Sequence, residues 1–295
     1  MGCPGTVCYP PDTMLSAGRL RPGAYSLLSG VLGALCIAST AHAQFVPRQE
    51  SLPAAGEQYH VEVSGGYWRP ATTVSVLSQE FGIPGTTIDF GKDLGLTDGM
   101  FPEFRATLRP ARKHKFRAEL IPLKYEQSVT ISRDLVFQGI KYKIGVPVAS
   151  TIDWKAYRFS YEYDVVAMNR GFFGVVLDTK YSDITTTLTS PIDKTSLHAK
   201  GPVPAIGAIA RVYPIEAVSL TAEFTGIKLP SAVKDYRAHY ADLDVYGTLN
   251  LARYFGIQAG FRRIDVGYSL LDNAIATDTG ALVMQGLYAR AVARF

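Results

Sequence analysis

Apolar and polar residues alternate over most of the chain after residue 58. From Tyr59 to Tyr67, one set of alternate positions is mainly apolar and the other is mainly polar. Successive side chains of a β-strand point to opposite faces, so a period of two predicts strands with one apolar face and one polar face. The alternation recurs in segments 103–109, 116–120, 157–164, 173–177, 206–212, 218–224, 243–251, 257–261 and 287–295.

The connections between these segments alternate between short and long. Short ones are expected near 111–113, 168–170, 214–216 and 254–255, and long ones over 70–100, 128–149, 183–200, 228–239 and 269–279. Outer-membrane barrels have short periplasmic turns, long external loops and an even number of antiparallel strands. We therefore predict an all-β fold, a transmembrane antiparallel up-and-down β-barrel of about ten strands. Eight and twelve strands are the alternatives, because segment 128–144 could lengthen two strands.

An export signal precedes the alternating region. Arg19 and Arg21 come before the uncharged apolar run 24–38, which is followed by the cleavage pattern Ala41, His42 and Ala43. An apolar run of about 15 residues is short for a membrane-spanning helix, which needs about 20. We therefore expect residues 1–43 to be removed as a signal peptide. Met14, which stands closer to the two arginines, is the more natural translation start.

Removal of the signal peptide divides the chain into simple parts. Gln44 is the expected new N-terminus, residues 44–57 a periplasmic segment and residues 58–295 the barrel. All three cysteines lie in the removed part, so the mature chain is expected to have no disulfide and no cysteine metal site. No P-loop, dinucleotide-binding, GxSxG or HExxH motif stands in a supporting context. Neither a cofactor nor a metal is therefore expected.

Composition alone would suit a soluble β-sandwich, since 47% of the residues are hydrophobic, 19% are charged and the net charge is +4. Tyrosines near the predicted strand ends favour a membrane barrel, in which aromatic girdles mark both bilayer edges. They are Tyr157, Tyr161, Tyr163, Tyr181, Tyr240, Tyr254 and Tyr268. The basic cluster within 109–115 falls in a predicted periplasmic turn, where it is either solvated or faces lipid headgroups. Nucleic acid is not an expected partner.

The polar faces of the predicted strands carry charges of both signs that would point into the barrel. The residues expected there are Glu62, Glu103, Arg105, Arg117, Glu119, Arg158, Glu162, Asp178, Arg211, Glu223, Asp242, Asp244, Arg262, Arg290 and Arg294. The signs nearly balance, whereas an ion-selective pore shows an excess of one sign. Side chains already fill barrels of about eight strands, and open channels belong to about sixteen. We therefore expect these charges to pair and to fill the interior.

An outer-membrane hydrolase that acts on lipid A or peptides is the alternative function. Such an enzyme needs a histidine, a carboxylate and often a serine near the outer rim. The candidate catalytic sets are His239 with Asp242 and Ser231, and His198 with Asp193 and Ser196. Neither set has the spacing expected of lipid A deacylases or omptin proteases.

The end of the chain carries a family resemblance. Phe295 is a terminal aromatic on the lipid-facing parity of the last segment, and Tyr288 and apolar alternation precede it. This ending resembles the signal that bacterial barrel-assembly machinery reads. The region 59–295 resembles the small OmpA-like and OmpW-like outer-membrane barrels, and segment 88–96 is similar to one that follows the first strand in members of that group.

The resemblance implies a place in the Gram-negative outer membrane. Outer-membrane lipids, lipopolysaccharide and the barrel-assembly machinery are then the expected partners, together with an unknown extracellular partner for the long loops. The expected function is non-enzymatic: envelope structure, surface interaction or slow passage of small solutes.

Overall fold

The computed structural model describes residues 54–78, 85–137, 139–228, 236–272 and 275–295, within a compact unit that spans residues 51–295. The predicted signal peptide, with Ala41, Ala43 and Gln44 at its cleavage site, and Ser231 lie outside the described residues. Within the described residues, no helix is both long enough and apolar enough to cross a bilayer.

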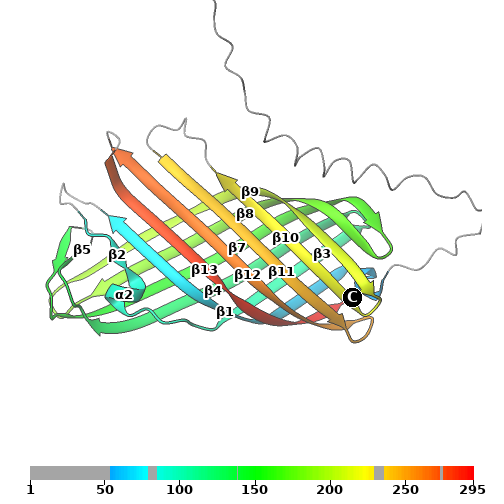
Figure 1. Ribbon diagram of the computed structural model, residues 1–295, viewed down its shortest axis with the longest axis horizontal. Coiled ribbons are helices and arrows are strands. Elements are labelled where there is room, and N and C mark those ends of the chain that lie inside the picture. Colours follow the sequence, from blue (N-terminus) through cyan, green and yellow to red (C-terminus); the bar gives the residue numbers. More distant parts are fainter. Residues whose placement is uncertain (1–53, 79–84, 138, 229–235, 273–274) are drawn as a thin grey trace, which may run out of the picture. The chain divides into compact units, whose positions relative to one another are not determined.

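Ten long strands form a closed antiparallel barrel (Figure 1). Each strand pairs with the next one in the chain, and the last pairs with the first, which closes the sheet. The strands are β1 (Val61–Ser78), β3 (Phe101–Ala111), β4 (His114–Thr130), β7 (Pro147–Met168), β8 (Gly171–Thr189), β9 (Lys194–Ile215), β10 (Val218–Lys228), β11 (Tyr236–Asn250), β12 (Phe255–Asp272) and β13 (Ile275–Arg294). The prediction of an all-β barrel of about ten strands is confirmed.

Tight turns connect the strands at one end of the barrel. They fall at residues 112–113, 169–170, 216–217 and 251–254, close to the predicted positions. The C-terminus lies at the same end (Figure 1), as does the short 3-10 helix η1 (Ala55–Glu57) that leads into β1. We call this the periplasmic end, because short turns lie on that side in outer-membrane barrels.

At the opposite end, which we call the outer end, strands replace much of the predicted loop. β1 continues through residues 70–78, and β8 and β9 stay paired as far as Thr189 and Lys194. The reason is local: Thr185, Thr186 and Thr187 are polar but β-branched, and β-branched residues suit a pleated ladder. Within 128–149, β4 and β7 pair up to Thr130 and a separate hairpin follows.

A small cap lies at the outer end, where Figure 1 labels β2, α2 and β5. It consists of β2 (Ile88–Asp89), α2 (Phe90–Leu94) and the hairpin of β5 (Leu135–Phe137) and β6 (Ile140–Tyr142). The Asp89 side chain caps α2, and Gly95 ends it with a φ of 65°, a conformation that glycine adopts without strain. Arg133 ties the two parts together, since its Nε donates to Asp93 Oδ1 at 2.8 Å.

The character of each strand face reverses between the two ends, as β7 illustrates. Toward the periplasmic end its outward residues are aromatic, namely Tyr157, Phe159, Tyr161 and Tyr163, and toward the outer end they are polar, namely Thr151, Asp153 and Lys155. Its inward residues change the other way, from Arg158, Ser160 and Glu162 to Trp154 and Ile152. An apolar outward face is stable against lipid, so the bilayer ends near Tyr157.

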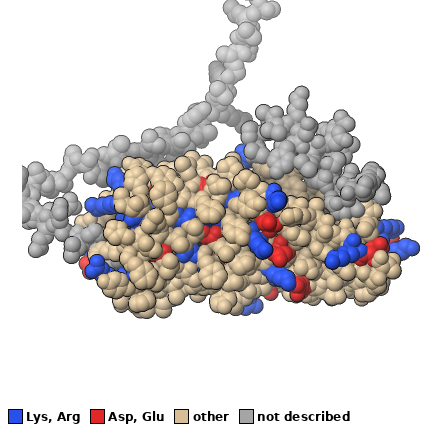
Figure 2. Space-filling model, turned by 180° about the vertical axis from the view of Figure 1, so that it is seen from behind, with Lys and Arg blue, Asp and Glu red and all other residues tan. Residues whose placement is uncertain are grey.

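The interior therefore has two layers. The layer nearer the outer end is apolar, and the cap packs onto it through Ile88, Phe90, Leu94, Leu135, Phe137 and Tyr142. The layer nearer the periplasmic end is charged. Outside the charged layer lies an apolar band that includes Phe104, Leu108, Phe116, Phe159, Leu177, Ile206, Leu220, Phe224, Ile257 and Leu287. Uncharged residues accordingly cover most of the face drawn in Figure 2.

Candidate functional site: the charged interior

Every strand of the barrel contributes inward-facing charges to the charged layer. Its acidic members are Glu57, Glu62, Glu103, Glu119, Glu162, Asp164, Asp178, Glu223, Asp242 and Asp244. Its basic members are Arg105, Arg109, Lys115, Arg117, Arg158, Lys180, Arg211, Arg262, Arg290 and Arg294. The two signs are present in equal numbers, and each member forms an ion pair within 4 Å of an opposite charge.

Arg262 of β12 is a hub of this network. Its Nη2 lies 2.8 Å from Asp242 on β11, and its Nη1 contacts Glu103 of β3 at 3.2 Å as well as Glu119 of β4. Arg290 of β13 also reaches Glu103, at 3.0 Å. One guanidinium therefore spans the lumen between strands on opposite parts of the wall, which fills the space between them.

Glu223 of β10 is a second hub. Its two oxygens accept from both terminal nitrogens of Arg117 on β4, at 2.6 and 3.1 Å, and it also contacts Arg158 on β7. Arg158 reaches Asp178 on β8 at 2.7 Å as well. Each partner has almost no solvent contact. A buried charge without a partner would lose hydration free energy of several kcal/mol, so these pairs hold each other in place.

The structure places each interior charge predicted from the sequence in this network, and it adds residues that were not expected there. Lys115 was read as part of a basic turn, but it lies inside the barrel, 2.6 Å from Glu162. Lys180 lies 2.8 Å from Asp242. Both residues share the inward parity of their strands, so alternation could have identified them. Lys115 also lies 3.4 Å from the ring centroid of Phe172, a favourable cation–π contact.

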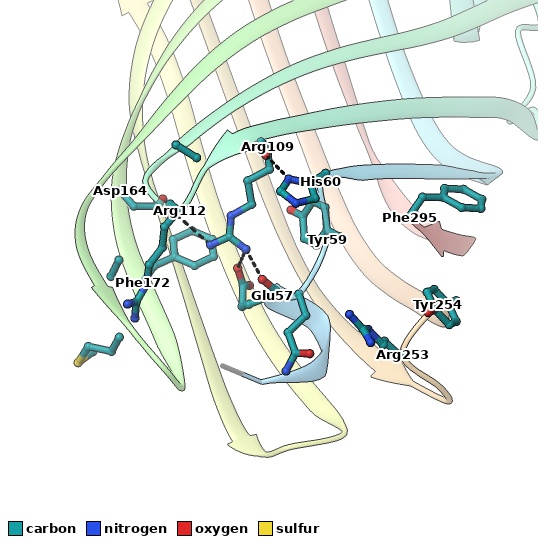
Figure 3. A pocket seen from close by; sticks show the side chains of 14 residues that line it. Glu57, Tyr59, His60, Arg109, Arg112, Asp164, Phe172, Arg253, Tyr254 and Phe295 are labelled. Carbon is teal, nitrogen blue, oxygen red and sulfur yellow. Dashed lines mark hydrogen bonds and ion pairs between the residues drawn. The ribbon is translucent and has the colours of Figure 1, made fainter. Parts of the chain in front are cut away.

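Glu57 comes from the segment that was expected to lie in the periplasm before the barrel. Its Oε1 accepts from Arg211 at 3.0 Å and from the Tyr213 hydroxyl at 2.9 Å, and its Oε2 lies 3.1 Å from Arg109. A side chain on Gly56 would lie 2.5 Å from that hydroxyl, so the turn fits closely. Figure 3 shows Glu57 pointing toward Arg109 inside the mouth. The N-terminal turn thus closes part of the periplasmic mouth.

Two small spaces lie between charged side chains of the described residues. One space of about 10 Å³ lies beside Arg105 and Arg211, and another of about 20 Å³ lies beside Trp154 and Arg262. A water molecule needs about 10–15 Å³, so each space holds roughly one. A larger pocket of about 380 Å³ opens at the periplasmic mouth around the N-terminal turn (Figure 3).

The candidate catalytic residues do not come together. Asp242 points inward to Arg262 and Lys180, whereas His239, three positions earlier on β11, is exposed on the outward face. His239 instead lies 3.1 Å from Asp265, and His198 lies 2.8 Å from Asp183 rather than near Asp193. Side chains an odd number of positions apart on a strand face opposite sides, which the proposed grouping overlooked. No cluster of metal ligands is found among the described residues.

The aromatic residues singled out in the sequence take two different positions. Tyr163 and Tyr254 are exposed on the outside, as expected for a girdle, but Tyr240 is buried inside near Lys180. Tyr288 also points inward, and its hydroxyl donates to Asp244 at 2.6 Å. Phe295 is 69% exposed at the periplasmic end. Of the two residues of the proposed assembly signal, Phe295 is therefore the one accessible from outside.

Solved bacterial outer-membrane proteins are similar to this chain to different degrees. The protease OmpT from Escherichia coli matches with a TM-score of 0.51 and 9% identity over 80% of this chain and 96% of its own. The P. putida toluene transporter TodX matches with 0.35 and 8%, over 83% and 93%. Outer membrane protein AlkL matches with 0.35 and 12%, over 86% and 98%. No family model and no curated protein matches. The likeness to OmpT shows the fold, an outer-membrane β-barrel.

Proposed function

We propose that this chain, with the fold of a bacterial outer-membrane barrel, is a non-enzymatic protein of the Gram-negative outer membrane. Its role would be to support the envelope and to present its outer end to an extracellular partner, with at most slow passage of small solutes. The supporting observation is the interior, in which equal numbers of acids and bases pair across the lumen. A selective open pore would instead need a water-filled lumen that is lined by an excess of charges of one sign.

Conductance in a planar lipid bilayer tests this proposal. The unmodified protein is expected to give small or rare conductance with little preference for ion sign. Arg290→Ala and Glu223→Ala each remove one partner of a buried pair and should open a path or lower thermal stability. Arg170→Ala, which alters an exposed turn pair, is the control. A large, steady and strongly selective conductance that both interior substitutions leave unchanged would overturn the proposal.

A hydrolase remains the second candidate because two histidine–aspartate pairs face outward near the outer end. They are His239 with Asp265 and His198 with Asp183. Such a pair can act as a general base. Among the described residues, neither histidine has a hydrogen-bonded serine, which weakens this candidate. Cleavage of a peptide library or deacylation of lipid A by the unmodified protein, abolished by His239→Ala or His198→Ala, would favour it.

A further inference from the structure

The outer wall of the barrel carries an apolar groove on the side of the β3–β4 hairpin. Its volume is about 590 Å³, and its lining includes Val61, Ala106, Leu108, Phe116, Ala118 and Phe159. Ala106 and Ala118 lie opposite each other in the ladder, and the larger pair of Leu108 and Phe116 lies one row closer to the turn. Small side chains between larger ones create a depression in a surface that faces lipid.

The turn below this groove is cationic. The hairpin turns at Arg112 and Lys113, and both side chains are exposed. Arg112 donates to the uncharged Asn169 side chain at 3.0 Å, and Lys113 forms no ion pair within the described part of the chain. Beside the turn, the Tyr161 hydroxyl and His114 Nδ1 are 2.7 Å apart. Aromatic residues and exposed cations are both typical of the bilayer interface.

The spacing of these two features matches one lipid molecule. Five residues separate Lys113 from Ala118, which is about 16 Å along a strand and about 12 Å along the membrane normal at the usual tilt. An acyl chain that begins at a headgroup bound by this turn passes the same depth, because half of the hydrocarbon core is about 15 Å thick. We propose that the β3–β4 hairpin binds an anionic phospholipid of the inner leaflet. Arg112 and Lys113 contact its phosphate, and one acyl chain occupies the groove.

Charge and position favour this occupant over two others. Lipopolysaccharide belongs to the opposite leaflet, whereas the cationic turn is at the periplasmic end. A second copy of the barrel, docked by the same face, would bring an identical cationic turn against this one, and like charges repel. A phospholipid with a negative headgroup satisfies both the turn and the groove.

Native mass spectrometry of the full barrel tests the site. The protein is released from micelles that contain equal amounts of phosphatidylglycerol and phosphatidylcholine with the same acyl chains. Preferential retention of phosphatidylglycerol is expected. Arg112→Gln and Lys113→Gln should each reduce that preference about fivefold. Lys124→Gln and Lys155→Gln, exposed lysines nearer the outer end, are the matched controls and should leave it unchanged.

A second variant tests the groove. Ala118→Phe fills it and should lower retention of both lipids while the preference for phosphatidylglycerol persists. Folding of each variant is checked by heat-modifiable gel mobility, and Ala118→Val replaces a variant that fails. Equal retention of the two lipids, or the same loss in the lysine controls, would overturn the proposal. So would a dimer that Ala118→Phe disrupts, because the groove would then join two copies.

Discussion

Two neighbouring arginines show that a shift of one position along a strand determines whether a charge is buried or exposed. Arg262 is buried in the lumen among three carboxylates, whereas the next residue, Arg263, has a side chain that is 45% exposed near Asp265. Both are the same residue type with nearly the same local sequence. The difference arises because successive side chains of a strand point to opposite faces.

Removing these two side chains should therefore have very different effects. Arg262→Ala leaves Asp242 and its neighbours without their main partner, and loss of one member of a buried pair costs about 3–5 kcal/mol. Arg263→Ala should change the free energy of unfolding by less than about 1 kcal/mol, as an exposed pair does. Urea unfolding in detergent micelles, followed by circular dichroism, measures both. Equal effects would mean that the lumen is solvated.

The alternation of inward and outward side chains along each strand explains which site residues could be found from the sequence. Alternation located Arg117, Glu119 and Arg262 because each belongs to a regular strand. Lys115 follows the same rule but was assigned to the turn next to it. Glu57 carried no such signal, because it precedes the first strand and reaches the lumen through a 3-10 turn. Contacts between distant segments, such as Glu57 with Arg211, depend on closure of the barrel.

At the scale of the strand, the reversal on β7 marks where lipid ends. A charge on the lipid-facing side of a barrel costs about 2–4 kcal/mol near the bilayer midplane and little at the interface. Phe159 lies two residues inside this boundary, so Phe159→Arg should lower stability in liposomes by up to that amount. Thr151→Arg, on the same face eight residues away, is the control and should have little effect. A similar cost at both positions would place the membrane boundary closer to the outer end.

The cap at the outer end should become less stable at low pH. The hydrogen bond from Arg133 lowers the pKa of Asp93 below its usual value of 3.8. This contribution to stability is therefore present above about pH 4 and is lost as pH falls through the lowered pKa. Asp93→Asn mimics the protonated state at neutral pH and should speed trypsin cleavage after Lys92 and Arg133. Asp134→Asn, at an exposed pair, is the control, and unchanged cleavage in Asp93→Asn would contradict the tether.

The reversal of face character on β7 also explains why the number of strands could be predicted from the sequence, whereas the extent of the loops could not. Inside the bilayer, apolar residues face outward and the alternation is strong. Beyond Tyr157 on β7, Trp154 and Ile152 face inward and the outward residues are polar. The pattern persists with opposite sense, so that stretch was not included in the predicted strand. The cap hairpin of β5 and β6 gave too short a pattern to be recognised.

At the scale of the whole molecule, the last residue closes the seam between β13 and β1. The Phe295 backbone donates to Val61 O at 2.8 Å and accepts from His60 and Val61. Its ring is exposed, so a backbone role and a recognition role can be separated. Phe295→Ala keeps the seam bonds, whereas deletion of the residue removes them.

We expect both changes to reduce the amount of membrane-inserted, heat-modifiable protein, because the exposed aromatic ring is the feature that assembly machinery would read. Deletion should reduce it further. Quantification of outer-membrane fractions measures the effect. Full insertion of Phe295→Ala would contradict the recognition role, while a defect confined to the deletion would assign Phe295 to closure alone.

The paired outer parts of β8 and β9 extend the barrel well beyond its apolar band. β9 has 22 residues, which is about 70 Å of strand and about 55 Å of height at the usual tilt. An apolar band of about 25 Å leaves a stalk that stands about 30 Å clear of the bilayer. Because the stalk is a hydrogen-bonded ladder around the buried side chains of Trp154 and Leu188, a ligand bound at its tip would be held at about that height above the lipid.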